Sequence, residues 1–344
     1  MVRLPVGKLP SHLLADMLSR APILDGRVVV PPGVGLDCAV VDVGSTLLVL
    51  KTDPITFTSE AIGWYAVQVN ANDIATTGAL PRWFLMTLLL PQADTSEELV
   101  EQISTQVFEA CRAMEISVIG GHTEITAGLN RPILVGTMIG EVKREDLVTP
   151  AGALPGDRLL LTKGVPIEAT AILAREFPNR LQSWLTLEEL SQARDFIFEP
   201  GISVLSEARL ALGAGKVTAM HDPTEGGLAA ALWELAEASQ CSLVVDLETA
   251  PIFPLSRQVC QAFSIDPLAS IASGALLITV PEGDVSAVCQ AIRSGGISCT
   301  QIGEVQAGPV AVWRVRSGAK ELLARPDRDA IARLFEYGSL PRGA

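Results

Sequence analysis

Three patterns are missing from this 344-residue sequence: long apolar runs, paired cysteines and clusters of basic residues. Without an apolar run of about 18 residues, we expect no membrane-spanning helix. The first ten residues include Arg3 and Lys8 but no apolar core, which argues against a secretory signal. The six cysteines form no Cys-x-x-Cys pair, which favours reduced thiols in a cytoplasmic protein over disulfides or a zinc site.

The missing basic clusters exclude a further class of partner. The formal charge is −13, from 39 acidic and 26 basic residues. Because affinity for a phosphate backbone comes from grouped lysines and arginines, we predict no nucleic-acid partner. A small phosphorylated ligand would instead be neutralised largely by divalent cations and backbone N–H groups.

Signatures of several common enzyme folds are also missing. The sequence has no G-x-x-x-x-G-K-[ST], no G-x-G-x-x-G at the start of a helix and no G-x-S-x-G. These absences argue against a P-loop fold, a dinucleotide-binding fold and an α/β-hydrolase nucleophile elbow.

Apolar patterns typical of strands and helices alternate along both halves of the chain. The turn-rich stretch 149–157 is the best boundary, so we predict two domains, residues 1–149 and 150–344. Neighbouring predicted strands, such as 38–43 and 47–51, are close enough to pair antiparallel across Gly44-Ser45. The expected class is α+β with mixed sheets.

Residues 69–79 contain the polar cluster on which the site prediction depends. They predict a helical segment carrying Asn72 and Asp73, followed by an apolar strand over 83–90. A carboxylate and its amide neighbours on a rigid element beside the core suit a hard cation or a phosphate. The alternative is that these side chains only cap or solvate the helix.

Four further polar clusters are predicted to lie where a strand ends or a helix begins. They are Gly35–Asp37, Lys51–Asp53, Gly120–Glu124 and His221–Gly227. Taken singly, each is explained by ordinary turn chemistry. Together, their carboxylates would hold Mg²⁺ and their glycines would let backbone N–H groups approach an anion. Lys163, in a strand–Thr-Lys-Gly–helix turn, would reach a phosphate as a point charge.

Several segments resemble the aminoimidazole-ribonucleotide (AIR) synthase superfamily. They include GLDCAVVD, KTDPITF, VNANDIATTGA, GGHTEIT, HDPTEGGLAAALWELAEAS and ASGALLITV, in family order over residues 33–305. Within that group, DPTEGGLA and ASGALLI are most similar to HypE, a hydrogenase-maturation dehydratase.

The resemblance implies an AIR synthase-like fold and an ATP-dependent reaction. The N-terminal domain would bind ATP and dimerise, its mixed sheet combining with that of a second copy into a β-barrel, and the C-terminal domain would be α+β. The homodimer would use ATP and Mg²⁺ to phosphorylate a poor oxygen acceptor, either a small molecule or a protein-bound group. The implied Mg²⁺–ATP carboxylates are Asp37, Asp53, Asp73 and Asp222, with Asp73 and Asp222 as catalytic residues.

The resemblance also implies contacts beyond the carboxylates. Asn72 would neighbour the metal, and Gly120, Gly121 and the side chain at 122 would approach the phosphates. Many members carry Asp where this chain has His122, whereas selenophosphate synthetases carry His.

One departure changes the expected acceptor. HypE proteins end in Pro-Arg-Ile-Cys, and the terminal cysteine carries the group that is dehydrated, whereas this chain has no cysteine after Cys299 and ends with residues 340–344 as Leu-Pro-Arg-Gly-Ala. We therefore expect an acceptor other than a thiol of the same chain. Two alternatives are a small-molecule kinase resembling thiamine-monophosphate kinase, and a nucleotide-responsive maturation partner without turnover.

Overall fold

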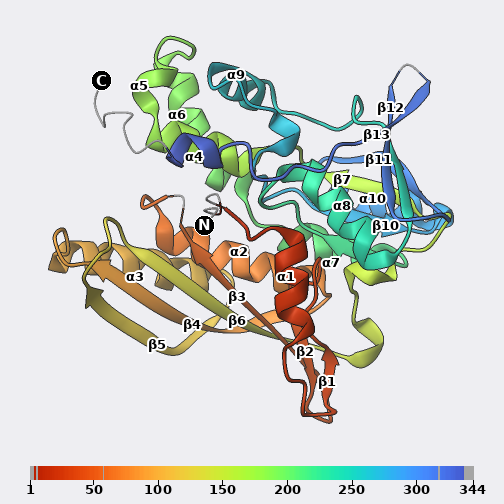
Figure 1. Cartoon of the computed structure of the whole chain (residues 1–344), viewed down its shortest axis with the longest axis horizontal. Helices are drawn as coiled ribbons and strands as arrows, with labels where there is room; N and C mark the ends of the chain where they lie inside the picture. The colour runs from red at the N-terminus through yellow and green to blue at the C-terminus, as the bar shows by residue number, and fades with distance from the viewer. Residues whose placement is uncertain (1–3, 5–6, 57, 317, 337–344) are drawn as a thin grey trace. The chain divides into compact units, whose positions relative to one another are not determined.

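The computed structural model describes residues 4, 7–56, 58–316 and 318–336. The chain divides into two compact units, coloured along the chain in Figure 1. A smaller unit contains Ile23–Pro32 and Asp37–Leu147, and a larger unit contains Met1–Pro22, Gly33–Leu36 and Val148–Ala344. Residues 340–344, where the sequence lacks the terminal cysteine of HypE proteins, lie outside the residues that the structure describes.

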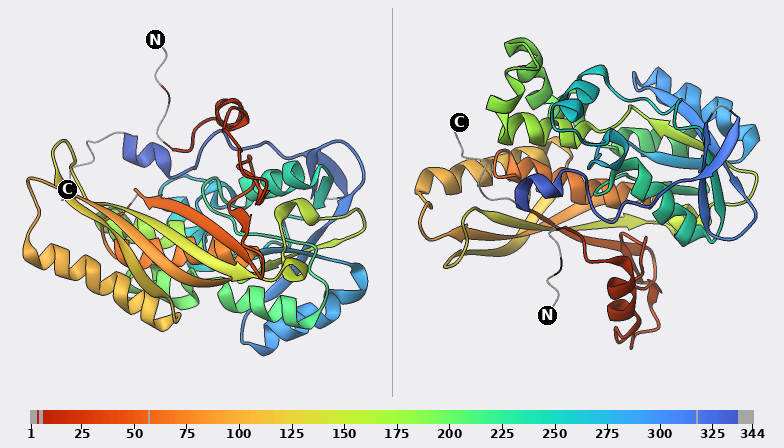
Figure 2. Two further views of the ribbon diagram at one scale, coloured as in Figure 1. Left: turned by 90° about the horizontal axis from the view of Figure 1, so that it is seen from below. Right: turned by 45° about the horizontal axis from the view of Figure 1, so that its top comes forward.

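A six-stranded mixed sheet forms the smaller unit, in the order β1-β2-β3-β6-β4-β5. The strands are β1 (Val28–Val30), β2 (Ala39–Asp42), β3 (Leu47–Ile55), β4 (Leu80–Pro91), β5 (Ser117–Thr126) and β6 (Ile133–Val142). β4 and β5 pair parallel, and the other neighbours pair antiparallel. Helices α2 (Ile62–Thr76) and α3 (Glu97–Ala113) cover one face of this sheet (Figures 1 and 2).

The two helices of the smaller unit differ in how much of their surface is buried. Ser96 caps the start of α3, since its side chain accepts a hydrogen bond from the Leu99 amide, and the helix buries only a stripe that includes Ile103 and Val107. α2 is buried on nearly every side. A helix so enclosed holds its polar residues, Asn72 and Asp73 among them, within the core of the unit.

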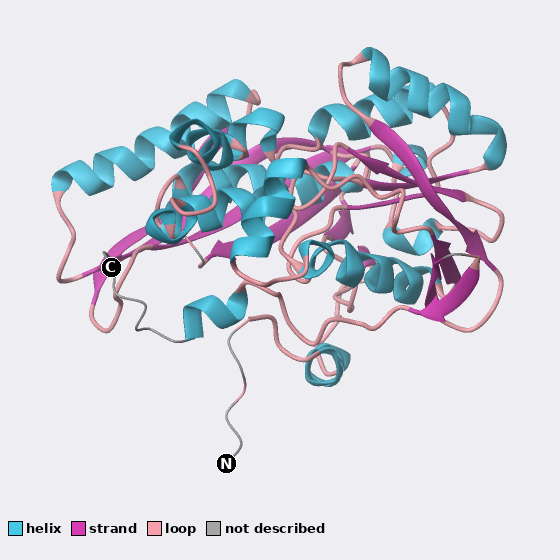
Figure 3. Cartoon of the chain, turned by 90° about the horizontal axis from the view of Figure 1, so that it is seen from above, coloured by secondary structure: helices cyan, strands magenta, loops and turns pink. Residues whose placement is uncertain are grey.

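A seven-stranded mixed sheet forms the larger unit, in the order β13-β12-β9-β11-β7-β10-β8. Figure 3 colours the strands magenta and the helices cyan. Its strands are β7 (Arg158–Thr162), β8 (Ala219–His221), β9 (Ser242–Val245), β10 (Leu277–Val280), β11 (Cys299–Gln306), β12 (Ala311–Arg316) and β13 (Ala319–Leu322). Its α-helices are α1 (Ser11–Ser19), α4 (Ile167–Glu176), α5 (Pro178–Leu181), α6 (Leu187–Asp195), α7 (Leu205–Ala214), α8 (Gly227–Ser239), α9 (Pro254–Ala262), α10 (Val285–Ser294) and α11 (Ala332–Glu336). Shorter turns are η1 (Arg144–Asp146) in the smaller unit, and η2 (Pro150–Gly152), η3 (Ile197–Gly201), η4 (Pro267–Ala269) and η5 (Glu282–Asp284) in the larger unit.

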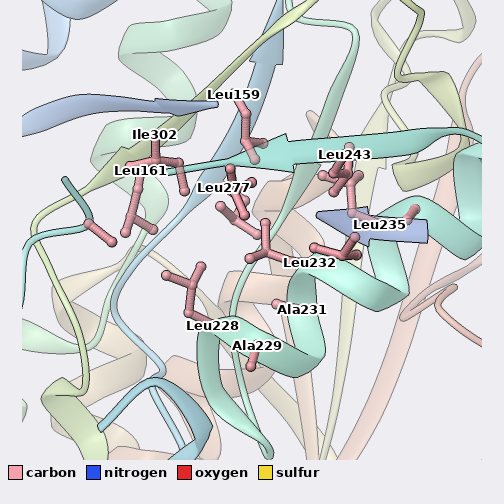
Figure 4. Close-up of a cluster of buried hydrophobic side chains, with 14 of the residues drawn as sticks. Leu159, Leu161, Leu228, Ala229, Ala231, Leu232, Leu235, Leu243, Leu277 and Ile302 are labelled. Atoms are coloured by element: carbon pink, nitrogen blue, oxygen red, sulfur yellow. The ribbon is translucent and has the colours of Figure 1, made fainter. Parts of the chain in front are cut away.

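The core of the larger unit forms between α8 and the sheet. Leu228, Leu232 and Leu235 recur at helical spacing and belong to one buried cluster with Leu159 and Leu277 of the strands (Figure 4). Each fully buried leucine contributes about 1.5–3 kcal/mol through the removal of apolar surface from water. This packing fixes the axis of α8 and therefore the place where the loop before it must end.

Two strands continue further than the sequence pattern predicts. β3 continues through Lys51–Asp53 to Ile55, and β5 continues through Gly120–Glu124 to Thr126. The prediction that these two polar clusters lie at strand ends is therefore wrong. Pairing with β6 and β4 supplies the backbone hydrogen bonds that keep the polar segments extended.

The prediction of an α+β fold with mixed sheets is confirmed. None of the described helices is long and apolar enough to cross a bilayer.

Candidate functional site

Three aspartates of the smaller unit converge on one lysine. The ammonium nitrogen of Lys51 lies 3.0 Å from Oδ2 of Asp73, 3.3 Å from Oδ2 of Asp53 and 4.0 Å from Oδ1 of Asp37. Asp37 precedes β2, Lys51 and Asp53 are on β3, and Asp73 is on α2. Residues two apart on a strand share a face, which brings Lys51 and Asp53 together. We call these four residues the Lys51 cluster.

The side chains of the Lys51 cluster differ in how much of their surface is exposed. The side chain of Asp73 is 2% exposed, that of Lys51 12%, and those of Asp37 and Asp53 are 24% and 34%. Burial by itself lowers the pKa of Lys51, but the charges of Asp73, Asp53 and Asp37 outweigh it and raise that pKa well above its ordinary value. Lys51 is therefore fully charged over the physiological pH range.

Polar neighbours hold the helix end that carries Asp73. The Asp73 carbonyl accepts hydrogen bonds from the Thr76 hydroxyl at 2.7 Å and from the Cys38 thiol at 3.3 Å. One turn earlier, the Asn70 amide donates to the Ala66 carbonyl at 2.8 Å. Asn72 is fully buried beside Asp73 in the sequence. These contacts fix the backbone from which the Asp73 carboxylate projects.

The Lys51 cluster gathers three carboxylates around one ammonium group. Asp37 and Asp53 remain partly exposed, and carboxylate oxygens are the ligands that Mg²⁺ prefers. Mg²⁺ itself stays a prediction for this chain.

The second acidic region lies in the larger unit, on the loop between β8 and α8. His221 Nε2 lies 3.0 Å from Oε2 of Glu234, and Asp222 is fully buried. Lys8 approaches the same loop, with its ammonium 3.3 Å from Oε2 of Glu225 and 3.8 Å from Oε1 of Glu234. An arm from the start of the chain therefore supplies a positive charge to this acidic loop. The role of Asp222 as a metal ligand stays a prediction.

Gly120, Gly121 and His122 lie in the exposed edge strand β5. The backbone at position 121 requires glycine, because a Cβ there would lie 1.8 Å from the Met86 carbonyl oxygen of β4. His122 is 65% exposed, and its Nε2 lies 3.3 Å from Oε2 of Glu124. The contact of Gly120, Gly121 and His122 with phosphates stays a prediction.

Lys163, predicted to reach a phosphate as a point charge, is engaged by groups of the larger unit. Its ammonium lies 2.6 Å from Oε1 of Glu207 and donates to the carbonyls of Ser203 and Gly274. Burial lowers the pKa of Lys163, and the charge of Glu207 opposes that shift. A side chain engaged in this way ties the end of β7 to the start of α7, and its contact with a phosphate stays a prediction.

Sequence reasoning missed the central position of Lys51. The available signal was its spacing, because Lys51 and Asp53 are two apart in a strand and must face the same side. A lysine on the same strand face as a carboxylate, with Asp37 and Asp73 motifs nearby, predicts a shared counter-ion.

The fold and this acidic site define a two-domain α+β protein with three carboxylates gathered around a lysine. Residues 35–142 match the AIR synthase related protein N-terminal domain, and residues 155–315 match the C-terminal domain of the same family. The chain therefore belongs to the AIR synthase related family.

Two curated relatives illustrate the range of this family. The carbamoyl dehydratase HypE of Cupriavidus necator is 27% identical over 271 residues, covering 75% of this chain and 73% of the relative. The thiamine-monophosphate kinase of Pyrococcus abyssi is 28% identical over 248 residues, covering 71% and 73%.

Solved structures share the fold at low sequence identity. Hydrogenase maturation protein HypE in complex with ATP superposes with a TM-score of 0.67 at 21% identity, covering 93% of this chain and 91% of that one. A ThiL protein complexed with AMPPCP and TMP gives 0.70 at 22% identity, with coverage of 92% and 94%. A HypE–HypF complex gives 0.69 at 20%, with coverage of 83% and 93%.

Proposed function

We propose that this chain is a Mg²⁺-dependent, ATP-using enzyme of HypE-like type that phosphorylates an oxygen of an acceptor. The observation that carries the proposal is the Lys51 cluster, in which carboxylates from three separate segments meet around one cation. The HypE complex with ATP and the ThiL complex with AMPPCP, both of the same fold, support nucleotide use.

The proposed ligand set follows the geometry of the smaller unit and the family motifs. Asp37, Asp53 and Asp73 would hold Mg²⁺, with Asn72 as a neighbour, and Asp222 of the larger unit is the fourth proposed ligand. When bound, Mg²⁺ supplies positive charge to the phosphate oxygens. The three aspartates keep Lys51 charged. Gly120, Gly121 and His122 are retained as proposed phosphate contacts.

The proposed chemistry needs no protein nucleophile. The acceptor oxygen bonds to the γ-phosphorus, the bond between that phosphorus and the β–γ bridging oxygen breaks, and ADP leaves. The protein contributes by holding the reactants in line and by neutralising charge.

The test of this proposal measures Mg²⁺-dependent ATP binding by calorimetry, together with ATP hydrolysis. We expect Asp73→Asn to weaken binding by about tenfold or more, because a charged ligand becomes neutral. Asp94→Asn is the matched control, since Asp94 is an exposed aspartate of the same unit. Absence of binding at millimolar ATP in the unmodified protein would reject the enzyme reading.

We further propose that residues 1–149 form the ATP-binding and dimerisation domain and residues 150–344 the AIR synthase-like C-terminal domain. The structural support for a homodimer is the sheet of the smaller unit. Its edge strand β5 is exposed along almost its whole length, and the face opposite α2 and α3 carries half-buried apolar side chains such as Leu85, Val135 and Ile139. Exposed edges and apolar faces of this kind are the usual surfaces for pairing with a second copy.

Sedimentation equilibrium tests the homodimer. We expect twice the chain mass of 36.4 kDa. Ile139→Lys should shift the protein towards monomer, whereas Leu154→Lys, at an exposed apolar residue of the larger unit, should not. A monomeric unmodified protein would contradict the barrel arrangement.

Two alternative functions have specific support. The 28% sequence identity with a thiamine-monophosphate kinase supports the function of a small-molecule kinase. Such a kinase would transfer the label of γ-labelled ATP to a stable product. The HypE–HypF complex supports a maturation partner that binds ATP without turnover, which would co-purify with another protein and release no phosphate. A cytoplasmic location is proposed on the six free, buried cysteines.

A further inference from the structure

The segment between β13 and α11 contacts α8 at its middle, near its end and at its beginning. Trp233 Nε1 donates to the Leu323 carbonyl at 3.1 Å, and Arg325 forms an ion pair with Glu237. Further on, the Asp329 carboxylate reaches the amide of Gly226 at 2.6 Å. We call residues 323–331 the strap. The family match ends at residue 315, so the strap lies outside it.

Asp329 caps α8 from a distant part of the chain. Gly226 is the N-cap residue of α8, with a left-handed φ of 81°, and its own side chain offers no acceptor to the first amides. The first turn of α8 contains no acidic residue. The Asp329 carboxylate supplies the missing negative charge at this helix end, where the dipole favours it.

The same carboxylate holds the strap itself. Its Oδ1 accepts from the Ile331 amide at 2.9 Å, while Oδ2 accepts from Gly226. The Ala330 amide donates to the Ala269 carbonyl at 2.9 Å, which anchors the strap on η4. Asp329 is buried, with 4% of its surface exposed. The loop before α8 and the strap are therefore fixed to one another at a single carboxylate.

We propose that Asp329 is a positioning residue of the candidate site, holding the loop 221–226 and through it Asp222. The inference rests on the proposed function for the role of Asp222, but not for the clamp itself. It makes the strap part of the functional protein, although the family domains end before it.

The charge on Asp329 gives this clamp a pH dependence. Burial raises the pKa of Asp329 to about 7, the hydrogen bonds from Gly226 and Ile331 oppose the rise, and the charge of Glu225 adds to it. Glu168 on α4 and Cys260 on α9 are the other titratable groups that interact with it, and Lys8 pairs with Glu225. Because the folded pKa lies above the ordinary value of 3.8, this group lowers the stability of the closed clamp as pH rises from about 4 to about 7.

Hydrogen exchange of the peptide spanning 222–228 tests the clamp without any nucleotide. We expect Asp329→Ala to accelerate exchange there by about tenfold, since a charge-assisted hydrogen bond is lost. Asp327→Asn, at an exposed carboxylate of the same strap, is the matched control. A folded Asp329→Ala protein with exchange equal to the control would overturn the proposal.

Asp329→Asn provides the second variant, because it keeps the shape and one acceptor oxygen. In the unmodified protein, protection at 222–228 should increase from pH 8 to pH 6 after correction for intrinsic rates, because the folded state binds the Asp329 proton more tightly than the open state does, whereas in Asp329→Asn it should be flat. A profile identical to the unmodified protein would also overturn the clamp, including when Asp329→Ala does not fold.

ATP binding then separates the clamp from the proposed function. If the unmodified protein binds Mg²⁺–ATP, we expect Asp329→Asn to weaken that affinity while the bulk of the protein exchanges normally. If the unmodified protein binds no ATP, the proposed function is wrong, and the exchange data alone test whether Asp329 holds the loop 221–226. Faster exchange at 222–228 with unchanged ATP affinity would refute the link from Asp329 to Asp222.

Discussion

The ammonium of Lys51 lies 3.0 Å from the carboxylate of Asp73, whose side chain is only 2% exposed. The pair joins a strand to a helix at the inner end of an acidic cluster. A buried charge that loses its counter-ion is strongly unfavourable, because desolvation is no longer compensated. This relationship makes Lys51 as important to the folded site as the aspartates that the sequence singles out.

Replacing Lys51 by methionine should destabilise the protein by about 3 kcal/mol at pH 7, since Asp73 is left buried without its cation. Urea unfolding measures the change. Millimolar Mg²⁺ should raise the unfolding midpoint of this variant more than that of the unmodified protein, because the carboxylates no longer have a resident counter-ion. Lys143→Met, at an exposed lysine of the same unit, is the control. Equal stability of the two variants would contradict the buried pairing.

Replacing Glu168 by glutamine should stabilise the protein at alkaline pH. Burial raises the pKa of Glu168 from 4.5 to about 8, with smaller increases from Glu225 and Asp329. The unfolded chain ionises at lower pH than the folded one, so this group lowers stability as pH rises from about 4.5 to about 8. The variant should gain at most about 5 kcal/mol at pH 8.5 and nothing near pH 4.

Chemical unfolding at both pH values measures that difference. Glu188→Gln, at an exposed glutamate, should show no such pH-dependent gain. A Glu168→Gln protein that is less stable at pH 8.5 would mean that the folded state depends on the ionised carboxylate.

Substitution by alanine should destabilise the protein to different extents at two adjacent glycines of β5. Both have left-handed φ values, 152° at Gly120 and 146° at Gly121. An added Cβ meets nothing within 4 Å at Gly120, but it lies 1.8 Å from the Met86 carbonyl oxygen at Gly121. We expect Gly120→Ala to cost about 1 kcal/mol from backbone strain alone. Gly121→Ala should cost clearly more and should increase exchange along β5, and similar losses in the two variants would argue against the close approach.

The thiols should be unreactive in the folded protein. All six cysteines are free and buried, and burial raises the pKa of Cys111, Cys260 and Cys299 to about 12. Because the thiolate is the reactive form, a disulfide reagent at pH 8 should label the native protein slowly. Denaturant should then release all six equivalents. Rapid labelling of even one thiol before denaturation would indicate a local opening that the fold does not show.

The pattern of apolar and polar residues close together in the sequence predicts much of the fold. The helix containing Asn72 and Asp73 and the pairing of the strands around Gly44-Ser45 follow from residues close together in the sequence. The family motifs were sufficient to nominate Asp37, Asp53 and Asp73, which the structure brings to one place.

Contacts between distant segments were not predictable in the same way. The pairing of Lys163 with Glu207 depends on how β7 meets α7, which no periodicity encodes. β5 continues through Gly120-Gly121-His122 because β4 offers a partner, although glycine pairs are typical of turns. Asp329 and Gly226 are 103 positions apart, and neither has a local signature for the other.

The chain passes between its two units at four places, after Pro22, Pro32, Leu36 and Leu147. The short piece Gly33–Leu36 is held in the larger unit, where the Cα of Gly35 comes so near the Glu234 carbonyl oxygen that an added Cβ would lie 3.0 Å from it. A hybrid gene joined at a single crossover near the middle would therefore combine an α8 from one parent with a Gly35 loop from another. Functional recombinants between relatives should be those that inherit these two segments together.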